Sequence, residues 1–199
     1  AALVAQARGR QVALHHRRGG PAYTRLGPLP FSYGTPPAFL VLKRKGDWLQ
    51  VSLPTRPNGG KAWIKAAAVT LFVTDYEIRV QLRRHRLVLR RGQKTVFDAP
   101  IAIGRAVTPT PTGRYFVTYT LRTPDPEGFF GPYALGLSAY SNVVTSFAGG
   151  NGQVGIHGTN TPSVLGRDVS HGCIRVGNAV ITRLAKTVPL GTPVVIRRT

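Results

Sequence analysis

The sequence predicts a mainly β protein that begins with a small barrel and continues with a larger β domain. Glycine and proline make up 39 of its 199 residues, about a fifth of the chain against an average of about 12%. They follow no collagen-like period, and they interrupt most windows of a dozen residues, which disfavours long helices. Several short runs alternate between apolar and polar residues, as strands buried on one face do. No stretch of about 18 apolar residues occurs, so we expect no transmembrane segment in this chain.

The N-terminal third contains the short strands and tight turns of a small barrel. We expect residues 1–7 to be an unstructured lead and the barrel to span residues 9–71. Residues 39–42 are a continuous apolar run, as in a buried strand, and residues 48–53 alternate between apolar and polar side chains as a half-buried strand does. A Pro/Gly-rich loop separates them from a further strand that starts at residue 62. A unit of about 60 residues with strands this short predicts a small barrel.

The motifs of this first unit resemble a bacterial SH3-like domain. The segments that carry the resemblance are GDWLQV at 46–51, GKAWI at 60–64 and AAV at 67–69. The resemblance covers about residues 9–71 and implies a module that binds or positions rather than catalyses. For Trp48 and Trp63 we expect ordinary core packing first, with a role as ligand-binding aromatics as the alternative.

The second unit, residues 74–199, continues the pattern of strands and adds one helix. Further strands are predicted by alternation or by aromatic and β-branched content at residues 77–82, 87–91, 95–97, 101–103, 114–121 and 193–197. A Pro/Gly-rich loop at 123–136 contains aromatic residues that we expect to be exposed. These aromatics either form a lid or wall of a groove or simply pack on the protein surface. The one clear helix begins with Asn178 as its N-cap and runs to residue 187, before Pro189 and Gly191.

The charge of the chain is strongly positive but evenly distributed. The formal net charge is +20, with 27 Lys and Arg against 7 Asp and Glu. Residues 1–70 and 71–199 each contribute +10, and neither a basic tail nor a zinc finger, helix-turn-helix or aromatic RNA-binding motif occurs. We therefore expect no dedicated nucleic-acid partner. A uniformly cationic surface suits an anionic polymer such as a cell wall.

The residues that can perform chemistry are concentrated near the C-terminus. The only cysteine, Cys173, follows His157 and His171 in a polar, glycine-rich stretch. Acyl transfer by a thiol needs a thiolate, a base and donors for the oxyanion. Cys173 would supply the sulfur and either histidine the base, while Gly172 leaves its neighbouring N–H groups accessible. The spacing matches no standard zinc pattern, so we expect no metal and no cofactor.

This stretch resembles the active-site signature of the L,D-transpeptidases, which have a YkuD-type catalytic domain. The matching segments are His157-Gly158, SHGCIR at 170–175, Asn178 and PTPTGRYF at 109–116, within a resemblance that covers about residues 74–199. It implies a β-sandwich with the active site in a groove and one short helix after the active-site motif. Many members carry serine after the first histidine, where this chain has glycine.

The resemblance also implies a role for each residue of the signature. Cys173 would be the nucleophile and His157 the base, a choice that the residues alone leave open. The remaining positions would shape the oxyanion pocket and orient the base (His171, Gly172 and Gly158) or contact the substrate (Ser170 and Arg175).

The implied substrates are peptidoglycan stem peptides. The thiolate would attack the carbonyl at the L-centre of the third residue of a tetrapeptide stem, release D-alanine and pass the acyl group to an amine. The alternatives are an L,D-carboxypeptidase, in which water is the acceptor, and a non-catalytic protein that binds the cell wall or another polyanion. We expect an extracytoplasmic protein whose export signal has been removed. We also expect residues 74–199 to suffice for chemistry on a small stem peptide, with residues 9–71 aiding residence on the wall.

Overall fold

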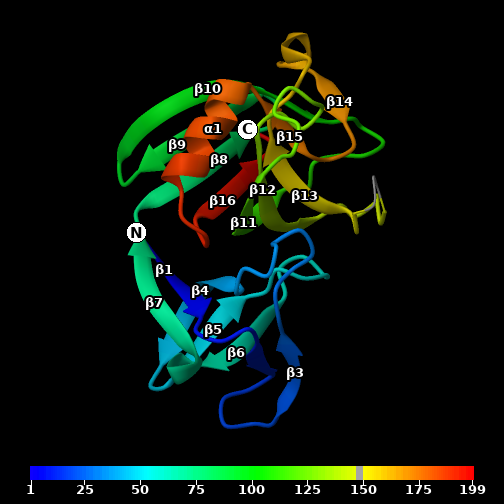
Figure 1. The fold of residues 1–199 in the computed structure, drawn as a ribbon. Helices are drawn as coiled ribbons and strands as arrows, with labels where there is room; N and C mark the ends of the chain where they lie inside the picture. Colours follow the sequence, from blue (N-terminus) through cyan, green and yellow to red (C-terminus); the bar gives the residue numbers. More distant parts are fainter. Residues whose placement is uncertain (147–149) are drawn as a thin grey trace.

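The computed structural model describes residues 1–146 and 150–199, which form two β units joined end to end (Figure 1). The N-terminal unit holds the first seven strands and the C-terminal unit the other nine, with a single α-helix on its outer face. Among these described residues, no helix has the length and apolar character that crossing a membrane requires.

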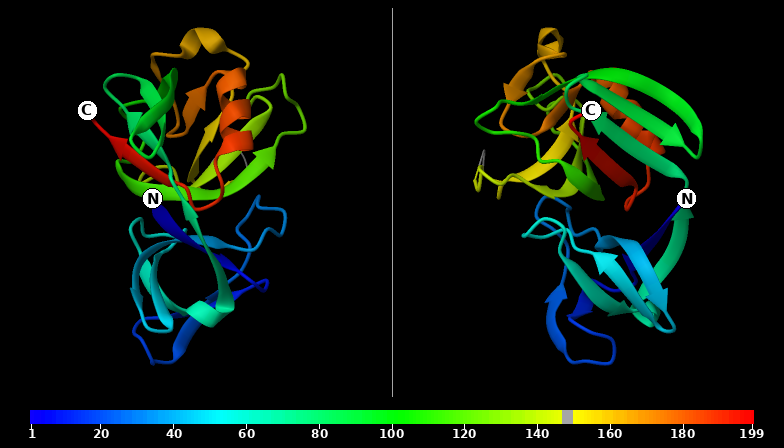
Figure 2. Two further views of the ribbon diagram at one scale, coloured as in Figure 1. Left: turned by 90° about the vertical axis from the view of Figure 1, so that its left-hand side faces the viewer. Right: turned by 180° about the vertical axis from the view of Figure 1, so that it is seen from behind.

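The N-terminal unit is one curved sheet, which we call the N-terminal sheet. Its strands are ordered β3-β2-β6-β5-β4-β1-β7, and Figure 2 shows them curling around a common interior. That interior is filled by fully buried side chains that include Phe39, Leu49 and Ile64. The strand bounds are β1 (Ala2–Ala7), β2 (Val12–His15), β3 (Ala22–Leu26), β4 (Ala38–Lys45), β5 (Trp48–Ser52), β6 (Lys61–Lys65) and β7 (Val69–Thr74), with a short 3₁₀ turn at Ala66–Ala68.

The expectation of an unstructured lead at residues 1–7 is wrong. These residues form β1, which pairs antiparallel with both β4 and β7. Val4 and Ala5 are fully buried. Alanine has a low intrinsic preference for strands, so this strand is specified by its two neighbours rather than by its own sequence. The N-terminal unit therefore spans residues 2–74, and its likeness to an SH3-like domain remains a prediction.

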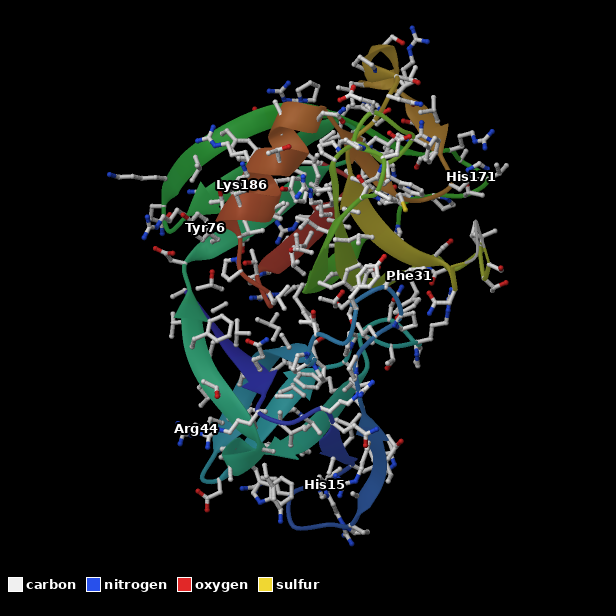
Figure 3. The ribbon with its side chains drawn as sticks, viewed as in Figure 1. His15, Phe31, Arg44, Tyr76, His171 and Lys186 are labelled. Carbon is white, nitrogen blue, oxygen red and sulfur yellow. The ribbon has the colours of Figure 1, made fainter. Side chains whose placement is uncertain are left out.

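Core packing, the first expectation for the two tryptophans, is not what the structure shows. Trp48 and Trp63 are half-buried and lie outside the apolar core. The Lys65 ammonium lies 5.8 Å from the centre of the Trp48 ring, and the Arg18 guanidinium lies 5.6 Å from that of Trp63. His15 meets Trp48 edge-on at 4.8 Å. In Figure 3, His15 lies at the end of the N-terminal sheet farthest from the C-terminal unit.

The C-terminal unit has the two β layers expected of a sandwich, joined by two strands that belong to both. β11 pairs with β16 through its first half and with β12 through its second. β10 likewise pairs with β9 and then with β15, so the residues expected as two strands at 95–97 and 101–103 form one long strand. The bounds are β8 (Tyr76–Gln81), β9 (Arg86–Arg91), β10 (Lys94–Gly104), β11 (Gly113–Arg122), β12 (Tyr133–Tyr140), β13 (Gln153–His157), β14 (Asp168–Ser170), β15 (Ile174–Val176) and β16 (Pro193–Arg197), with a 3₁₀ turn at Pro162–Val164.

The predicted helix is present, but it is capped differently from the prediction. α1 (Asn178–Thr187) begins after Gly177, which is the N-cap and makes no side-chain capping bond. The Asn178 side chain instead accepts a hydrogen bond from the Thr159 N–H at 2.9 Å. α1 buries Ile181 and Leu184 against the core of the C-terminal unit. The start of the helix is thereby tied to the chain that follows His157.

Candidate active site

The strand register brings the predicted nucleophile and base to the same face of the sheet. β13 and β15 lie side by side and parallel, with Ile156 opposite Ile174 and His157 opposite Arg175. Side chains alternate between the two faces of a strand, and both isoleucines are fully buried in the core. Cys173 is two residues before Arg175, so it shares the opposite face with Arg175 and His157.

That face forms the floor of a groove with a volume of about 510 Å³. The groove is lined by Cys173, His157, His171 and Arg175, and by Phe129 and Phe130 of the loop between β11 and β12. The two phenylalanines are 41% and 42% exposed, and the Phe130 ring meets the His157 ring edge-on at 4.9 Å. This aromatic loop is thus a groove wall, one of the two alternatives that its sequence left open.

His157 is held as a neutral imidazole with a defined tautomer. Its side chain is buried, and Nδ1 donates a hydrogen bond of 2.7 Å to the carbonyl oxygen of Gly158. A carbonyl can only accept, so Nδ1 carries the proton and Nε2 keeps its lone pair. Burial lowers the pKa of His157 to about 4, and the positive charge of Arg175 acts in the same direction. The imidazole is therefore neutral at neutral pH, with Nε2 unprotonated.

Cys173 is partly exposed at the groove, but its thiol is not acidified. Burial raises the pKa of Cys173, while a backbone hydrogen bond from Gly155 and the charge of Arg175 partly oppose that rise. A cysteine beside imidazoles and glycines in the sequence predicts a lowered thiol pKa, but desolvation outweighs the effects that would lower it. In the resting protein the sulfur therefore keeps its proton.

His171, the competing candidate base, has its Nε2 engaged. Arg105 Nη2 lies 2.7 Å from His171 Nε2. A guanidinium can only donate, so this nitrogen accepts the bond and the proton of a neutral imidazole lies on Nδ1. The lone pair that would remove a proton from Cys173 is thus already used. This geometry favours His157, the choice that only the resemblance supported.

Two hydroxyl groups fix the loop that presents the cysteine. Ser170 Oγ donates to the Cys173 carbonyl at 2.6 Å and accepts from the Gly172 N–H at 3.1 Å. Thr110 Oγ1 donates to the Gly172 carbonyl at 2.9 Å, which ties the turn at 108–113 to the loop. Gly172 has a φ of 118°, a backbone conformation that residues other than glycine rarely adopt. These bonds occupy the Ser170 hydroxyl and the Gly172 N–H, which we had expected to meet the substrate and the oxyanion.

Glycine at position 158 is required by a close backbone approach. A Cβ at Gly158 would collide with the Asn178 side-chain oxygen and with the backbone of Gly131. Gly131 belongs to the aromatic loop, so the two glycines let that loop lie directly against the residue after His157. The serine that many L,D-transpeptidases carry at this position would not fit here without a shift.

Arg175 faces the groove with part of its hydrogen-bonding capacity unused. Its guanidinium stacks over the Phe129 ring, 4.5 Å from the ring centre. Its Nε is buried and has no hydrogen-bond partner among the described residues. A buried N–H without an acceptor is uncommon in proteins. Because the Arg175 side chain also lines the groove, its guanidinium can meet an anionic or carbonyl oxygen of a ligand.

Sequence reasoning missed three residues that shape the site. Arg105 belongs to none of the predicted strands or motifs, and Thr110 lies in the PTPTGRYF segment, for which the sequence indicates no role; they act on His171 and on the cysteine loop. Asn178 is expected as a cap and as part of the signature, with no role for its side chain beside His157. No local pattern marked Arg105, because its partner is 66 residues away. Across residues 1–146 and 150–199, no cluster of three or more His, Cys, Asp or Glu side chains could hold a metal ion.

Comparison with known proteins gives a consistent result. A family model described as the L,D-transpeptidase catalytic domain, YkuD, matches residues 75–196. Two similar proteins, both named as L,D-transpeptidases YkuD, come from bacilli. The one from Bacillus subtilis is 37% identical over 127 residues, and the one from Bacillus licheniformis is 40% identical over 121 residues. These matches cover 64% and 61% of this chain, and 69% and 65% of the two relatives.

The likeness to solved structures extends over both units. An L,D-transpeptidase from Mycobacterium smegmatis superposes on 99% of this chain and 99% of its own, with a TM-score of 0.54. The sequence identity is 14%, so the likeness concerns the fold alone. It shows that the arrangement of an N-terminal β unit before this catalytic fold is shared.

Proposed function

Since the chain belongs to the YkuD family of L,D-transpeptidase catalytic domains, we propose that it transfers acyl groups between peptidoglycan stem peptides through a thioester on Cys173. The observation that supports this most strongly is the pairing of β13 with β15, which gives Cys173 and His157 one face of a shared groove. A neutral imidazole beside a protonated thiol is the pair that general-base activation of a nucleophile needs.

In the first half-reaction, His157 Nε2 takes the thiol proton as the sulfur attacks the stem carbonyl at the L-centre of the third residue. The negative charge that develops on the carbonyl oxygen is stabilised by the N–H of Cys173 itself, because the Gly172 N–H is bound to Ser170. The intermediate collapses to the thioester and expels D-alanine, whose amine receives the proton from His157.

In the second half-reaction, an acceptor amine attacks the thioester carbonyl and gives a proton to His157. Collapse of this intermediate forms the new amide and releases the Cys173 sulfur, which recovers its proton from His157. The enzyme returns to its resting state, so the cycle needs no metal and no cofactor.

Other residues of the signature have supporting roles in this proposal. Arg175, whose Nε is buried with no hydrogen-bond partner in residues 1–146 and 150–199, binds a carboxylate or carbonyl oxygen of the stem. Ser170 stabilises the cysteine loop rather than contacting the substrate, and Gly158 orients the base through its carbonyl. His171 shapes the groove beside Arg105. The substrate is a wall polymer, so the protein acts outside the cytoplasm, and its positive charge also favours anionic wall polymers as partners.

Product analysis separates this proposal from its alternatives. The protein is incubated with a disaccharide-tetrapeptide, with and without a second stem that offers a side-chain amine. A transpeptidase releases D-alanine and forms a cross-linked dimer when the amine is present. A carboxypeptidase releases D-alanine but yields only the tripeptide in both cases. A non-catalytic binding protein releases no D-alanine, and Cys173→Ala should behave in that way under every condition.

A further inference from the structure

One residue that lines the groove comes from the N-terminal unit. Phe31, in the loop between β3 and β4, lines the same groove as Cys173 and His157. Its ring is 47% exposed, so it is available to a ligand in the groove. In Figure 3, Phe31 lies where the N-terminal sheet meets the C-terminal unit, opposite the end that contains His15.

The loop holds Phe31 there in an unusual backbone conformation. Phe31 has a φ of 65° and Tyr33 a φ of 49°, in the left-handed region that aromatic residues rarely adopt. Two successive turns fix the loop, with Ser32 N bonded to the Leu29 carbonyl at 3.1 Å and Thr35 N to the Ser32 carbonyl at 3.0 Å. Strained residues of this kind are concentrated at ligand-binding sites.

The position of the N-terminal sheet relative to the groove is fixed by a specific interface. Asn58 pairs with both backbone groups of Tyr140: its Nδ2 donates to the carbonyl at 2.7 Å, and its Oδ1 accepts from the N–H at 2.9 Å. The Tyr140 hydroxyl in turn donates to the Pro54 carbonyl at 2.9 Å in a buried contact. Tyr140 ends β12, the strand next to β13, so this interface lies beside the catalytic strands.

Arg56 binds the chain that follows β12. Its Nη1 donates to the Ser141 carbonyl at 2.7 Å, and its Nη2 donates to the Asn151 carbonyl at 3.2 Å and to that of Val144 at 3.3 Å. Ser141, Val144 and Asn151 all line the groove. One guanidinium from the N-terminal unit thus holds both described ends of the β12–β13 connection, whose residues line the groove together with Phe31.

We propose that the N-terminal sheet is part of the substrate-binding site, with Phe31 as a residue that contacts the bound peptide and Arg56 as a positioning residue for the groove wall. Phe31 faces a groove that already contains Phe129 and Phe130, so it suits the aliphatic portions of a peptide whose polar end reaches Arg175. The identity of that peptide as a stem rests on the proposed function. The inference replaces the expectation that the first unit only aids residence on the wall.

The kinetic test compares Phe31→Ala with Tyr33→Ala in the full chain. Tyr33 is a matched control, because it lies in the same loop with the same backbone strain, is 84% exposed and does not line the groove. For a soluble stem tetrapeptide, Phe31→Ala should raise KM by about tenfold, the usual scale for losing one aromatic anchor, with kcat little changed. Phe31→Leu should recover most of the loss. An unchanged KM in Phe31→Ala, or an equal rise in Tyr33→Ala, overturns the inference.

A second readout does not depend on the proposed reaction. Cys173 is alkylated with iodoacetamide and, separately, with an iodoacetamide that bears an N-benzyl group. Phe31→Ala should slow the benzyl reagent relative to the small one, whereas Tyr33→Ala should leave the ratio of rates unchanged. If the wild type fails to act on any stem peptide, the proposed function fails while this ratio still decides the role of Phe31. A ratio that is the same in all three proteins contradicts it.

The role of Arg56 is tested by removing one positive charge at position 56 and, as a control, at position 44. Arg56→Ala should raise the KM for the tetrapeptide severalfold and leave alkylation of Cys173 by iodoacetamide unchanged, because the reacting atoms are untouched. Arg44→Ala removes the same charge from an exposed site on β4, away from the groove, and should change neither. Arg56→Lys should be intermediate, since an ammonium cannot replace the planar fork of donors. A rise in KM that Arg44→Ala reproduces would assign the effect to net charge and refute a positioning role.

Discussion

At the scale of single residues, the reactive pair rests uncharged. Burial lowers the pKa of His157 to about 4 and raises that of Cys173, so neither group is ionised at neutral pH. In the proposed mechanism, the thiolate forms only as its proton moves to His157 during attack. This arrangement protects an exposed thiol from unwanted alkylation and oxidation, because thiolates react far faster than thiols.

The two histidines should therefore differ in their importance to chemistry. His157→Ala should lower kcat/KM by at least about 10²-fold, the usual scale for losing a general base. His171→Ala removes the side chain that accepts from Arg105 and leaves the base in place, so it should have a smaller effect. Steady-state kinetics on the tetrapeptide measures both, with the thermal transition as the control for folding. A larger loss in His171→Ala would reverse the assignment of the base.

The lowered pKa of His157 also makes stability depend on pH. An unfolded chain protonates this histidine below its ordinary pKa of about 6.5, whereas the folded protein does so only below about 4. Folding stability is therefore complete above pH 6.5 and is lost as the pH falls from 6.5 to 4, by about 3 kcal/mol if His157 alone is counted. Urea unfolding at pH 7 and pH 4.5 should show this loss in the wild type and a smaller one in His157→Gln. Equal losses would mean that His157 is not buried as a neutral group.

At the scale of elements, the site depends on β13 and β15, two strands that the sequence did not reveal. β15 has three residues and β13 has five with a central glycine, and neither alternates long enough to be recognised. The longer alternating runs were predicted correctly, as β8, β9 and β16 show. The signature predicts which residues react, but only the register between strands distant in the sequence brings those residues to one face. For the same reason the sequence did not predict β1 or the position of Phe31. β1 forms by pairing with distant strands, and Phe31 reaches the groove through the contact between the two units.

The contact between the two units is also an element-scale feature that can be tested. Asn58→Ala leaves both backbone groups of Tyr140 without their partner, and it should lower the unfolding free energy by about 1–3 kcal/mol. Both tryptophans lie in the N-terminal sheet, so fluorescence reports on that unit, while alkylation of Cys173 reports on the other. In the variant, the fluorescence transition in urea should shift to lower concentration. Asn160→Ala, in an exposed loop, should change stability by less than about 0.5 kcal/mol.

At the scale of the whole molecule, the two ends of the N-terminal sheet have different surroundings. One end contributes to the groove, and the opposite end presents Trp48 and Trp63 beneath Lys65 and Arg18. With a net charge of +20, the protein is suited to remain on an anionic wall while the groove receives the peptide. This dual use of the first unit is a proposal that charge and geometry support.

Binding to insoluble peptidoglycan should weaken as salt rises, because exposed charges are screened over about 10 Å at about 0.1 M salt. The double change Arg18→Gln and Lys65→Gln should weaken the pull-down further than Arg83→Gln with Arg84→Gln, which removes equal charge from the other unit. The rate on a small soluble peptide should change little in either. Binding that ignores salt, or that responds equally to both double changes, would refute a wall-binding role for the aromatic end.

The proposed thioester between Cys173 and the acyl donor can be observed by intact-protein mass spectrometry. The protein is mixed with a disaccharide-tetrapeptide without an amine acceptor, quenched in acid and weighed. We expect an adduct with the mass of the disaccharide-tripeptide acyl group, formed with release of D-alanine. The adduct should map to Cys173, be removed by hydroxylamine and be absent from Cys173→Ala. An adduct at another residue, or D-alanine release by Cys173→Ala, would contradict the account.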